Sequence, residues 1–303
     1  MPNQYRQHTW SDQLGDDCLQ LVRLAVREDL DRGQDWTTVS MVNSSQQAQA
    51  TVVSRQNGVF CGTRVVEVIE EAMQLDVQVT HHVQDEEPMV GGQKLIHISG
   101  NARDILTAER TLLNFLGRLC GIATLTAKYV AQVEGTGACV YDTRKTTPGW
   151  RRLEKYAVRC GGGTNHRTGL FDAILIKDNH LAFSNLQAAP DKAIALVRQF
   201  LNEPGTPVER DSLPITIEVD SLDQFQRALP ADPDIVLLDN MTLEELTRAC
   251  EIRRQSAPNV LLEASGGITL DTLRAVALTG VDRISIGALT HSAVALDLGL
   301  DWS

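Results

Sequence analysis

Residues 138–145 read ACVYDTRK and residues 173–180 read AILIKDNH, and in both stretches a short apolar run leads directly into charged residues. The apolar part has the length and composition of a strand that is buried on both faces, as in a parallel sheet. Similar runs recur at four later places, each separated from the next by a helical pattern: 215–219, 234–238, 260–264 and 283–286. Strands that alternate with helices predict parallel pairing through right-handed crossovers.

The residues at the ends of these six runs distinguish two α/β architectures. Six strands fit either an open doubly wound sheet or a β/α barrel with fewer than the usual eight units. A doubly wound sheet concentrates its functional groups at one switch point, whereas a barrel draws them from the ends of several strands. Here polar residues or a glycine follow every run: Asp142, Arg144, Lys145, Lys177, Asp178, Asn179, Glu218, Asp220, Asp239, Asn240, Glu263, Ser265 and Gly287. We therefore predict an incomplete β/α barrel.

The first third of the chain mixes strands and helices in a less regular order. Ser11 can cap a helix whose apolar residues recur at helical spacing. Two further helices are predicted, at 65–73 and at about 102–119, and short strand-like runs occupy 50–54, 75–80 and 94–99. This mixed order predicts a small α+β domain ahead of the barrel.

The composition argues against several classes of protein. With 28 basic and 39 acidic residues the formal net charge is -11, so binding of nucleic acid or anionic membranes through the overall charge is not expected. The polar residues 1–10 lack the apolar core of a signal peptide, and no stretch has the composition of a membrane span. The six cysteines include no C-x-x-C pair, so we expect reduced thiols in a cytoplasmic enzyme.

The segment from Asp142 to His180 departs from this acidic balance, with eight basic and four acidic residues. Arg144 and Lys145 directly follow a strand and Lys177 ends the next one, at positions where barrel side chains point to one mouth. Guanidinium groups bind carboxylates or phosphates through two hydrogen bonds, and lysine adds a point charge. The segment therefore predicts a site for small, multiply anionic substrates. A solvated helix face remains an equal alternative for three of its residues: Arg151, Arg152 and Lys155.

Three further features fit the binding of a sugar phosphate. The glycine run 161–163 precedes Asn165-His166-Arg167 and could bring backbone N–H groups close to an anion, although a flexible turn is the alternative. Glu218 and Asp239 end the third and fourth strands and could bind sugar hydroxyls or Mg²⁺; a capping or ion-pairing role is the alternative. The last two strands lead into 265–267 and Gly287, where barrels usually hold a phosphate.

These motifs, taken in order, closely resemble those of the quinolinate phosphoribosyltransferase family, the carboxylating nicotinate-nucleotide pyrophosphorylases. The run DTRKTTPG from Asp142 to Gly149 resembles the family's D-T-R-K-T-x-P-G. The resemblance covers essentially the whole chain, and the other matching segments are 28–38, 107–110, 121–124, 155–158, 161–167, 176–180, 218–220, 238–240, 263–267 and 287–291.

The resemblance implies a fold and a reaction. The fold would comprise an N-terminal α/β sandwich domain of residues 1–113, to which residues 292–303 return, and an incomplete β/α barrel of about six to seven strands over residues 114–291. The reaction would transfer the phosphoribosyl group of phosphoribosyl pyrophosphate to quinolinate in NAD biosynthesis, giving nicotinate mononucleotide, pyrophosphate and CO₂. The chain would act as a homodimer and use Mg²⁺.

The same resemblance implies roles for individual residues. Arg144, His166, Arg167 and Lys177 would surround the quinolinate carboxylates, with Arg110 reaching in from the neighbouring subunit. Lys145 would face the pyrophosphate, and Glu218 and Asp239 would bind the ribose hydroxyls and Mg²⁺. The expected catalytic residues are Lys145, Lys177, Glu218 and Asp239. The remaining expected substrate-binding residues are Thr143, Ser265, Gly266, Gly267, Gly287 and His291.

Three alternatives remain open at this point. A Schiff-base aldolase barrel would use Lys145 or Lys177 as its amine. A non-catalytic metabolite sensor would keep an anion pocket but would have no need of the acidic pair Glu218 and Asp239. A nicotinate-specific transferase would have no second carboxylate to hold, and therefore less use for so many cations.

Overall fold

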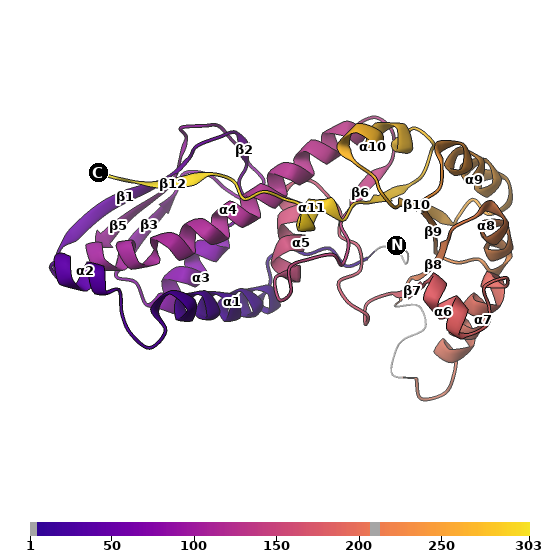
Figure 1. The fold of residues 1–303 in the computed structure, drawn as a ribbon, viewed down its shortest axis with the longest axis horizontal. Coiled ribbons are helices and arrows are strands. Elements are labelled where there is room, and N and C mark those ends of the chain that lie inside the picture. Colours follow the sequence, from indigo (N-terminus) through magenta and orange to yellow (C-terminus); the bar gives the residue numbers. More distant parts are fainter. Residues whose placement is uncertain (1–4, 207–212) are drawn as a thin grey trace. The chain divides into compact units, whose positions relative to one another are not determined.

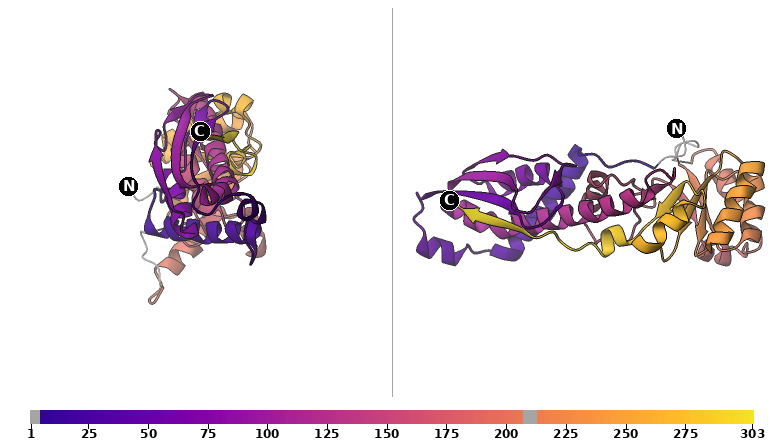
Figure 2. Two further views of the ribbon diagram at one scale, coloured as in Figure 1. Left: turned by 90° about the vertical axis from the view of Figure 1, so that its left-hand side faces the viewer. Right: turned by 90° about the horizontal axis from the view of Figure 1, so that it is seen from above.

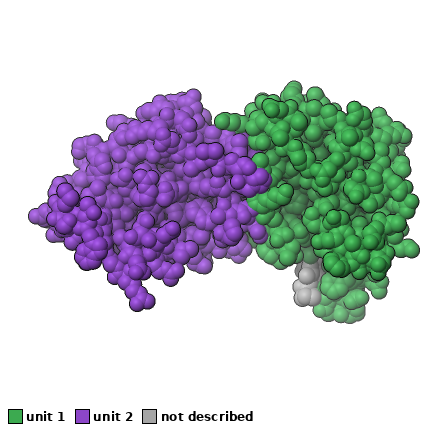
Figure 3. Space-filling view, in the orientation of Figure 1, with its two compact units in different colours: residues 1–7, 128–145, 163–288 green, residues 8–127, 146–162, 289–303 purple. Residues whose placement is uncertain are grey.

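The computed structural model describes residues 5–206 and 213–303, which form two compact units. Both units draw on distant parts of the sequence, and Figure 3 colours them green and purple. Unit 1 comprises residues 1–7, 128–145 and 163–288, and unit 2 comprises residues 8–127, 146–162 and 289–303. Each unit is built around a sheet of its own.

Unit 1 contains a parallel sheet of six strands in the order β6-β11-β10-β9-β8-β7. The strands are β6 (Cys139–Tyr141), β7 (Ile174–Ile176), β8 (Ile215–Val219), β9 (Ile235–Asp239), β10 (Leu261–Ser265) and β11 (Arg283–Ser285). All six predicted strands are confirmed to within one residue at either end. The first strand in sequence pairs with the last, as in a barrel, and the four between follow in chain order. The barrel prediction is therefore confirmed, with an open seam between β6 and β7 in the described sheet.

Helices cover the outer side of this sheet. They are α6 (Asp178–Phe183), α7 (Pro190–Leu201), α8 (Leu222–Ala228), the short η1 (Leu229–Ala231), α9 (Leu243–Ser256) and α10 (Leu270–Ala277). Figure 1 shows α7 to α10 around the outside of the strands, and Figure 2 shows the same arrangement from above. Because the helices occupy the outer face, the carboxyl ends of the strands are left to present side chains at one edge.

Unit 2 contains an antiparallel sheet in the order β12-β1-β5-β3. Its strands are β1 (Gln47–Ser54), β3 (Val77–His81), β5 (Lys94–Asn101) and β12 (Leu298–Trp302), and a separate hydrogen-bonded pair joins β2 (Gly58–Val59) to β4 (Pro88–Met89). The three predicted strands of this region are confirmed. The fourth, β12, comes from the end of the chain and pairs with β1, so the last residues complete the first sheet (Figure 2).

The helices of unit 2 pack against one another and against the sheet. They are α1 (Asp12–Leu30), α2 (Trp36–Met41), α3 (Thr63–Met73), α4 (Ala102–Val133), α5 (Arg151–Cys160) and α11 (Ala288–His291), of which α4 and α11 continue from or into unit 1. Apolar residues of α3, α4, β3 and β5 line one small shared cavity, which fixes the face of the sheet that these helices cover. Ser11 caps α1 as predicted, since its hydroxyl accepts the N–H of Leu14 at 3.4 Å.

Helix α4 extends fourteen residues beyond the predicted end at Leu119, to Val133. The continuation includes Gly121, a residue type that ordinarily weakens a helix interior. In the structure a Cβ at Gly121 would overlap the carbonyl oxygen of Val294, and Leu296 donates its N–H to the carbonyl of Gly117 at 2.8 Å. The two glycines therefore let the C-terminal segment cross the helix at backbone contact.

Two observations bear on the expectations drawn from composition. None of the helices in residues 5–206 and 213–303 combines the length and apolarity that crossing a bilayer requires. The six cysteines are all free, and five are buried as expected of core residues, while Cys139 is exposed.

Candidate active site

Most of the expected site residues belong to unit 1, and only Arg110 and His291 belong to unit 2. In unit 1 the strand register aligns Glu218 with Leu237 on β9 and Asp239 with Ser265 on β10. Residues two apart on a strand point to the same face, so Glu218, Asp239 and Ser265 lie on the inner, strand-end side of neighbouring strands. The expectation that the strand ends meet at one edge is thus confirmed for the sheet itself.

Lys177 and Glu218 form an ion pair across two strands, with 2.6 Å between Nζ and Oε2. Glu218 and Asp239 also line one cavity of about 260 Å³, to which Asp178 and Asp220 contribute as well. Asp239 accepts a hydrogen bond from the side chain of Asn240 at 2.7 Å. The cavity therefore offers several carboxylate oxygens, and Lys177, through its ion pair with Glu218, balances part of their charge.

Arg144 and Arg167 place two guanidinium groups near each other. Burial, followed by the positive charge of Arg144, lowers the pKa of Arg167 from its ordinary value. The Nε of Arg144 is buried and has no hydrogen-bond partner among the described residues. Arg167 is itself buried, and among the described residues its guanidinium donates only a long hydrogen bond, 3.3 Å, to the carbonyl of Ala173. Two partly desolvated cations of this kind are suited to an anion with more than one negative charge.

The loop that carries Arg167 is fixed from both sides by carboxylates. The buried Asp142 accepts the backbone N–H of His166 at 2.8 Å and the side-chain amide of Asn165 at 2.7 Å. On the other side Asp172 accepts the N–H groups of Thr168 and Gly169, at 2.6 and 2.9 Å. These bonds hold the pKa of Asp172 below its ordinary value although burial acts to raise it. The position of Arg167 is therefore set by a rigid loop.

His166 lies between this loop and a buried glutamate. Its Nδ1 accepts the backbone N–H of Arg167 at 2.8 Å, and its Nε2 lies 3.2 Å from Oε1 of Glu263. Glu263 is fully buried and also accepts the hydroxyl of Ser285. Burial alone would raise the pKa of Glu263, but His166, Ser285 and Arg283 together lower it, so the carboxylate is the favoured form. Sequence reasoning placed Glu263 at a strand end; its buried contact with His166 depends on folding that no local pattern reveals.

The glycines near the strand ends have separate structural reasons. Gly266 has φ 98° and a Cβ there would overlap Asn240, whereas Gly267 has φ 60° and open space around it. Gly267 thus presents uncovered backbone beside Ser265. The earlier run differs, because a Cβ at Gly161 would overlap the carbonyl of Ala123 and Gly162 has φ 81° at the end of α5. Close packing and a turn account for those two glycines.

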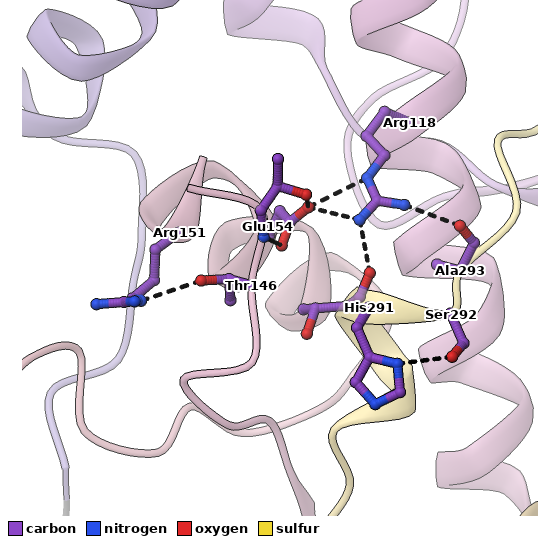
Figure 4. A network of polar contacts seen from close by, with 9 residues as sticks. Arg118, Thr146, Arg151, Glu154, His291, Ser292 and Ala293 are labelled. Carbon is purple, nitrogen blue, oxygen red and sulfur yellow. Dashed lines mark hydrogen bonds and ion pairs between the residues drawn. The ribbon is translucent and has the colours of Figure 1, made fainter. Parts of the chain in front are cut away.

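Unit 2 holds the segment around His291 through a buried ion pair that sequence reasoning missed. Arg118 on α4 binds the carboxylate of Glu154 at 2.6 Å and also donates to the carbonyls of Thr290 and Ala293, at 2.5 and 2.8 Å (Figure 4). Glu154 in turn accepts both the N–H and the hydroxyl of Thr147, the last at 2.8 Å. Arg118 thereby links three segments, and the exposed His291 lies within one of them, hydrogen-bonded to Ser292.

The basic residues of α5 do not share one environment. Lys155 is fully buried, so the solvated-face interpretation is wrong for it, whereas Arg151 and Arg152 are half-buried. Arg152 pairs with Asp17 of α1 at 2.5 Å, and Arg151 donates to the hydroxyl of Thr146 at 3.0 Å (Figure 4). Arg110, on α4, is exposed, and its side chain makes no hydrogen bond or ion pair with the described residues.

Comparison with known families yields two matches that together span most of the chain. Residues 35–120 match the N-terminal domain of quinolinate phosphoribosyl transferase, and residues 122–301 match its C-terminal domain. The nicotinate-nucleotide pyrophosphorylase [carboxylating] of Mycobacterium leprae is 43% identical over 92% of this chain and 95% of its own length. A probable enzyme of the same name from Methanothermobacter thermautotrophicus is 38% identical over 93% of this chain and 98% of its own length.

Solved structures give the same result. The nicotinate-nucleotide pyrophosphorylase from Francisella tularensis superimposes with a TM-score of 0.87 at 36% identity, covering 99% of this chain and all of the other. That from Ehrlichia chaffeensis has a TM-score of 0.83 at 35% identity, covering 94% and 98%. Human nicotinic acid phosphoribosyltransferase shares the fold, with a TM-score of 0.61 at 13% identity over 94% of this chain and 73% of its own.

Proposed function

The chain belongs to the quinolinate phosphoribosyl transferase family, and we propose that its reaction takes place at the strand-end edge of unit 1. It is a carboxylating nicotinate-nucleotide pyrophosphorylase, which converts quinolinate and phosphoribosyl pyrophosphate into nicotinate mononucleotide in NAD biosynthesis. In this reaction the ring nitrogen displaces pyrophosphate from C1 of the ribose, and the carboxylate next to that nitrogen then leaves as CO₂.

The observation that carries the choice of site is the pair of guanidinium groups at Arg144 and Arg167. Quinolinate is a dianion, and the two cations lie near each other in a partly desolvated position, with Nε of Arg144 lacking a partner in the described chain. We assign them to the quinolinate carboxylates together with Lys177 and His166, and Thr143 lies beside them on the strand end. If both guanidinium groups bind the carboxylates, they orient the ring nitrogen toward the ribose carbon, and this orientation favours the displacement.

Glu218 and Asp239 are proposed to bind the ribose hydroxyls and Mg²⁺. Carboxylate oxygens are the ligands that Mg²⁺ prefers, and the cavity that they line with Asp178 and Asp220 fits this donor set. A bound Mg²⁺ would neutralise charge on the departing pyrophosphate. Lys177 pairs with Glu218 in the free protein and thereby orients that carboxylate.

The leaving group and the 5′-phosphate are proposed to contact other residues. Lys145 is exposed beside Thr143 and can reach a pyrophosphate from the strand end. Ser265, Gly266, Gly267 and Gly287 offer hydroxyl and backbone N–H groups, which suit a phosphate. We propose His291 as a further phosphate ligand on the strength of its motif.

Decarboxylation needs little additional acid or base catalysis. Once the N-glycosidic bond has formed, the ring nitrogen is cationic and stabilises the carbanion that CO₂ leaves behind. The carbanion then takes a proton, giving the nicotinate ring. This explains a site that is rich in Arg and Lys and that relies on electrostatic stabilisation rather than on a nucleophile.

We also propose that the chain acts as a cytoplasmic homodimer in which Arg110 serves the neighbouring subunit's site. Its exposure and its lack of a partner in the described chain are compatible with that role. Residues 1–113 with 292–303, and residues 114–291, are proposed as the two functional domains. They overlap the compact units without coinciding with them.

The decisive experiment combines the protein with quinolinate labelled at the 2-carboxylate, phosphoribosyl pyrophosphate and Mg²⁺. We expect labelled CO₂ and nicotinate mononucleotide in equal amounts, with loss of both on adding a chelator. Nicotinate in place of quinolinate is the control and should give little product, because it has no second carboxylate to engage both arginines. Product from nicotinate at an equal rate would reject the proposed specificity, and a borohydride-trapped lysine adduct would favour the aldolase alternative.

A further inference from the structure

The N-terminal segment of the chain reaches the interior of unit 1 through Tyr5. The side chain is buried and forms one hydrophobic cluster with Tyr141, Ala173 and Ile235. Its hydroxyl forms a hydrogen bond with Oγ1 of Thr216 at 2.9 Å. Burial, followed by the charge of Glu263, raises the pKa of this phenol far above its ordinary value, so it remains protonated. Tyr5 is thus a fixed part of the barrel interior although it precedes β6, the first strand of the barrel, by more than a hundred residues.

The strand register places Tyr5 one layer below the site residues. Thr216, which is hydrogen-bonded to Tyr5, and Ile235, which belongs to the same hydrophobic cluster as Tyr5, are partners across β8 and β9. Two residues further along these strands come Glu218 and Leu237, and Leu237 is in turn the register partner of Glu263. Since alternate residues of a strand share a face, the layer above the Tyr5 ring contains Glu218 and Glu263.

Tyr5 contacts that upper layer through the ring of His166. The two rings are stacked, with centroids 4.3 Å apart and 26° between their planes. Tyr141 meets Tyr5 edge-on at 6.4 Å, and the guanidinium of Arg283 lies 5.2 Å from the Tyr5 centroid. Stacked and edge-on aromatic pairs have preferred geometries, so these neighbours restrict how the His166 ring can tilt.

The tilt of the His166 ring matters because the next residue is attached to it. Nδ1 of His166 accepts the backbone N–H of Arg167 at 2.8 Å, while Nε2 faces Glu263 at 3.2 Å. A rotation of the ring would break one of these contacts and move the backbone from which the Arg167 guanidinium extends. The His166 ring is therefore the one residue that contacts both the Tyr5 ring and the backbone N–H of Arg167 in this series of contacts.

We propose that Tyr5 is a positioning residue for quinolinate binding, which holds Arg167 in place through the stacked ring of His166. This inference rests on the proposed function for the identity of the ligand. It assigns a role in the site to the N-terminal segment, which the motifs of the barrel leave out. Affinity for quinolinate then depends on an aromatic ring at position 5, whereas affinity for phosphoribosyl pyrophosphate does not.

Steady-state kinetics of two substitutions in the full chain test this proposal. Tyr5→Leu keeps an apolar side chain but removes the ring, and it should raise KM for quinolinate roughly tenfold, the factor that loss of an aromatic pair can produce. KM for phosphoribosyl pyrophosphate should stay within about twofold. Tyr5→Phe keeps the ring and should restore quinolinate KM to near the wild-type value. The matched control is Trp10→Leu, which removes an aromatic residue that packs on Tyr156 in unit 2 and should change neither KM.

An NMR measurement separates this proposal from the assigned reaction. The carbon-bound ring protons of His166 should shift on Tyr5→Leu, because the stacked ring current is lost, but not on Trp10→Leu. If the wild-type protein makes no nicotinate mononucleotide, the proposed function fails, and calorimetric binding of quinolinate to the same variants still tests Tyr5. Tyr5→Met replaces Tyr5→Leu if the latter does not fold. Equal rises in both KM values, or no rescue by Tyr5→Phe, would overturn the proposal.

Discussion

Arg144 and Arg167 illustrate how charge that destabilises the free protein can serve binding. Two guanidinium groups near each other repel, and burial has removed part of the water that would screen them. Under the proposed assignment, an anion with two carboxylates would relieve both costs, and part of the energy of ligand binding would come from this arrangement. The loop that carries Arg167 is held by Asp142 and Asp172, which accept the backbone N–H groups of His166 and Thr168, so a local cation can be kept in place within a chain of net charge -11.

Substitution Arg144→Lys should lower kcat/KM for quinolinate by roughly 10- to 100-fold although charge is conserved. A hydrogen bond to a charged group contributes about 1.5–3 kcal/mol, and lysine cannot reproduce the two parallel bonds of the guanidinium fork. Steady-state kinetics with quinolinate as the varied substrate measure the effect. The control is Arg248→Lys, in an exposed ion pair with Glu251 on α9, which should leave kcat/KM unchanged. Near-wild-type kinetics for Arg144→Lys would remove this residue from the site.

Substitution Glu154→Ala should destabilise the protein by about 3 kcal/mol, because it leaves Arg118 without its buried partner. Glu154 is fully buried and Arg118 is largely so, which limits solvent screening of the pair. Glu67→Ala is the matched control: it breaks an exposed pair with Arg64 and should cost less than about 1 kcal/mol. Urea unfolding monitored by circular dichroism measures both. Equal effects of the two substitutions would show that the Arg118 contacts contribute little.

At the scale of elements, the strands of unit 1 were predictable and the exact extent of α4 was not. Each strand of the parallel sheet is a local apolar run bounded by polar residues, so its signal is contained within a few adjacent residues. The interior of α4 is instead contacted at Gly117 and Gly121 by Leu296 and Val294, which cross it from far along the chain. A glycine that weakens a helix and a glycine that admits another segment are indistinguishable in sequence.

Substitution Gly121→Ala tests this explanation because it should destabilise the protein, whereas the same substitution in a helix interior usually stabilises it. Alanine in a helix interior is ordinarily more stable than glycine, by about 0.5–1 kcal/mol. At Gly121 the added Cβ would overlap the carbonyl oxygen of Val294, and we expect a net loss of about 1–3 kcal/mol. Gly15→Ala in α1 is the control, since the nearest atom to its Cβ is 4.0 Å away, and it should stabilise. Thermal unfolding of the two variants should shift in opposite directions; a rise for both would contradict the packing argument.

For the site, as for the helices and strands, the sequence predicted some residues but not the contacts that hold them. The strand-end residues Lys177, Glu218 and Asp239 could be named because a barrel presents such positions at one mouth. The contacts that hold the site could not be named, since Tyr5 meets Thr216 across 211 positions and Arg118 meets Glu154 across 36. Such pairs have no periodicity and no motif. They arise only when the sheet has brought distant segments together.

At the scale of the whole molecule, both units depend on chain segments that return from elsewhere. Unit 2 takes β12 from the end of the chain, and unit 1 takes Tyr5 from its beginning. The side chain of Arg110 on α4 is exposed and has no hydrogen-bond or ion-pair partner among the described residues. Under the proposal above, its guanidinium would act in the site of a second copy of the chain.

Mixing two inactive variants tests whether Arg110 acts in the neighbouring subunit. After random subunit exchange between Arg110→Ala and Arg144→Ala dimers, half of all dimers are hybrid, and each hybrid has one intact site if Arg110 acts across the interface. About a quarter of the wild-type activity should then return, which the CO₂ assay measures. If Arg110 acts within its own subunit, every site in the mixture lacks one arginine and no activity returns. Exchange is verified independently by co-purification of differently tagged subunits, so an inactive mixture with verified hybrids would place Arg110 in the site of its own subunit.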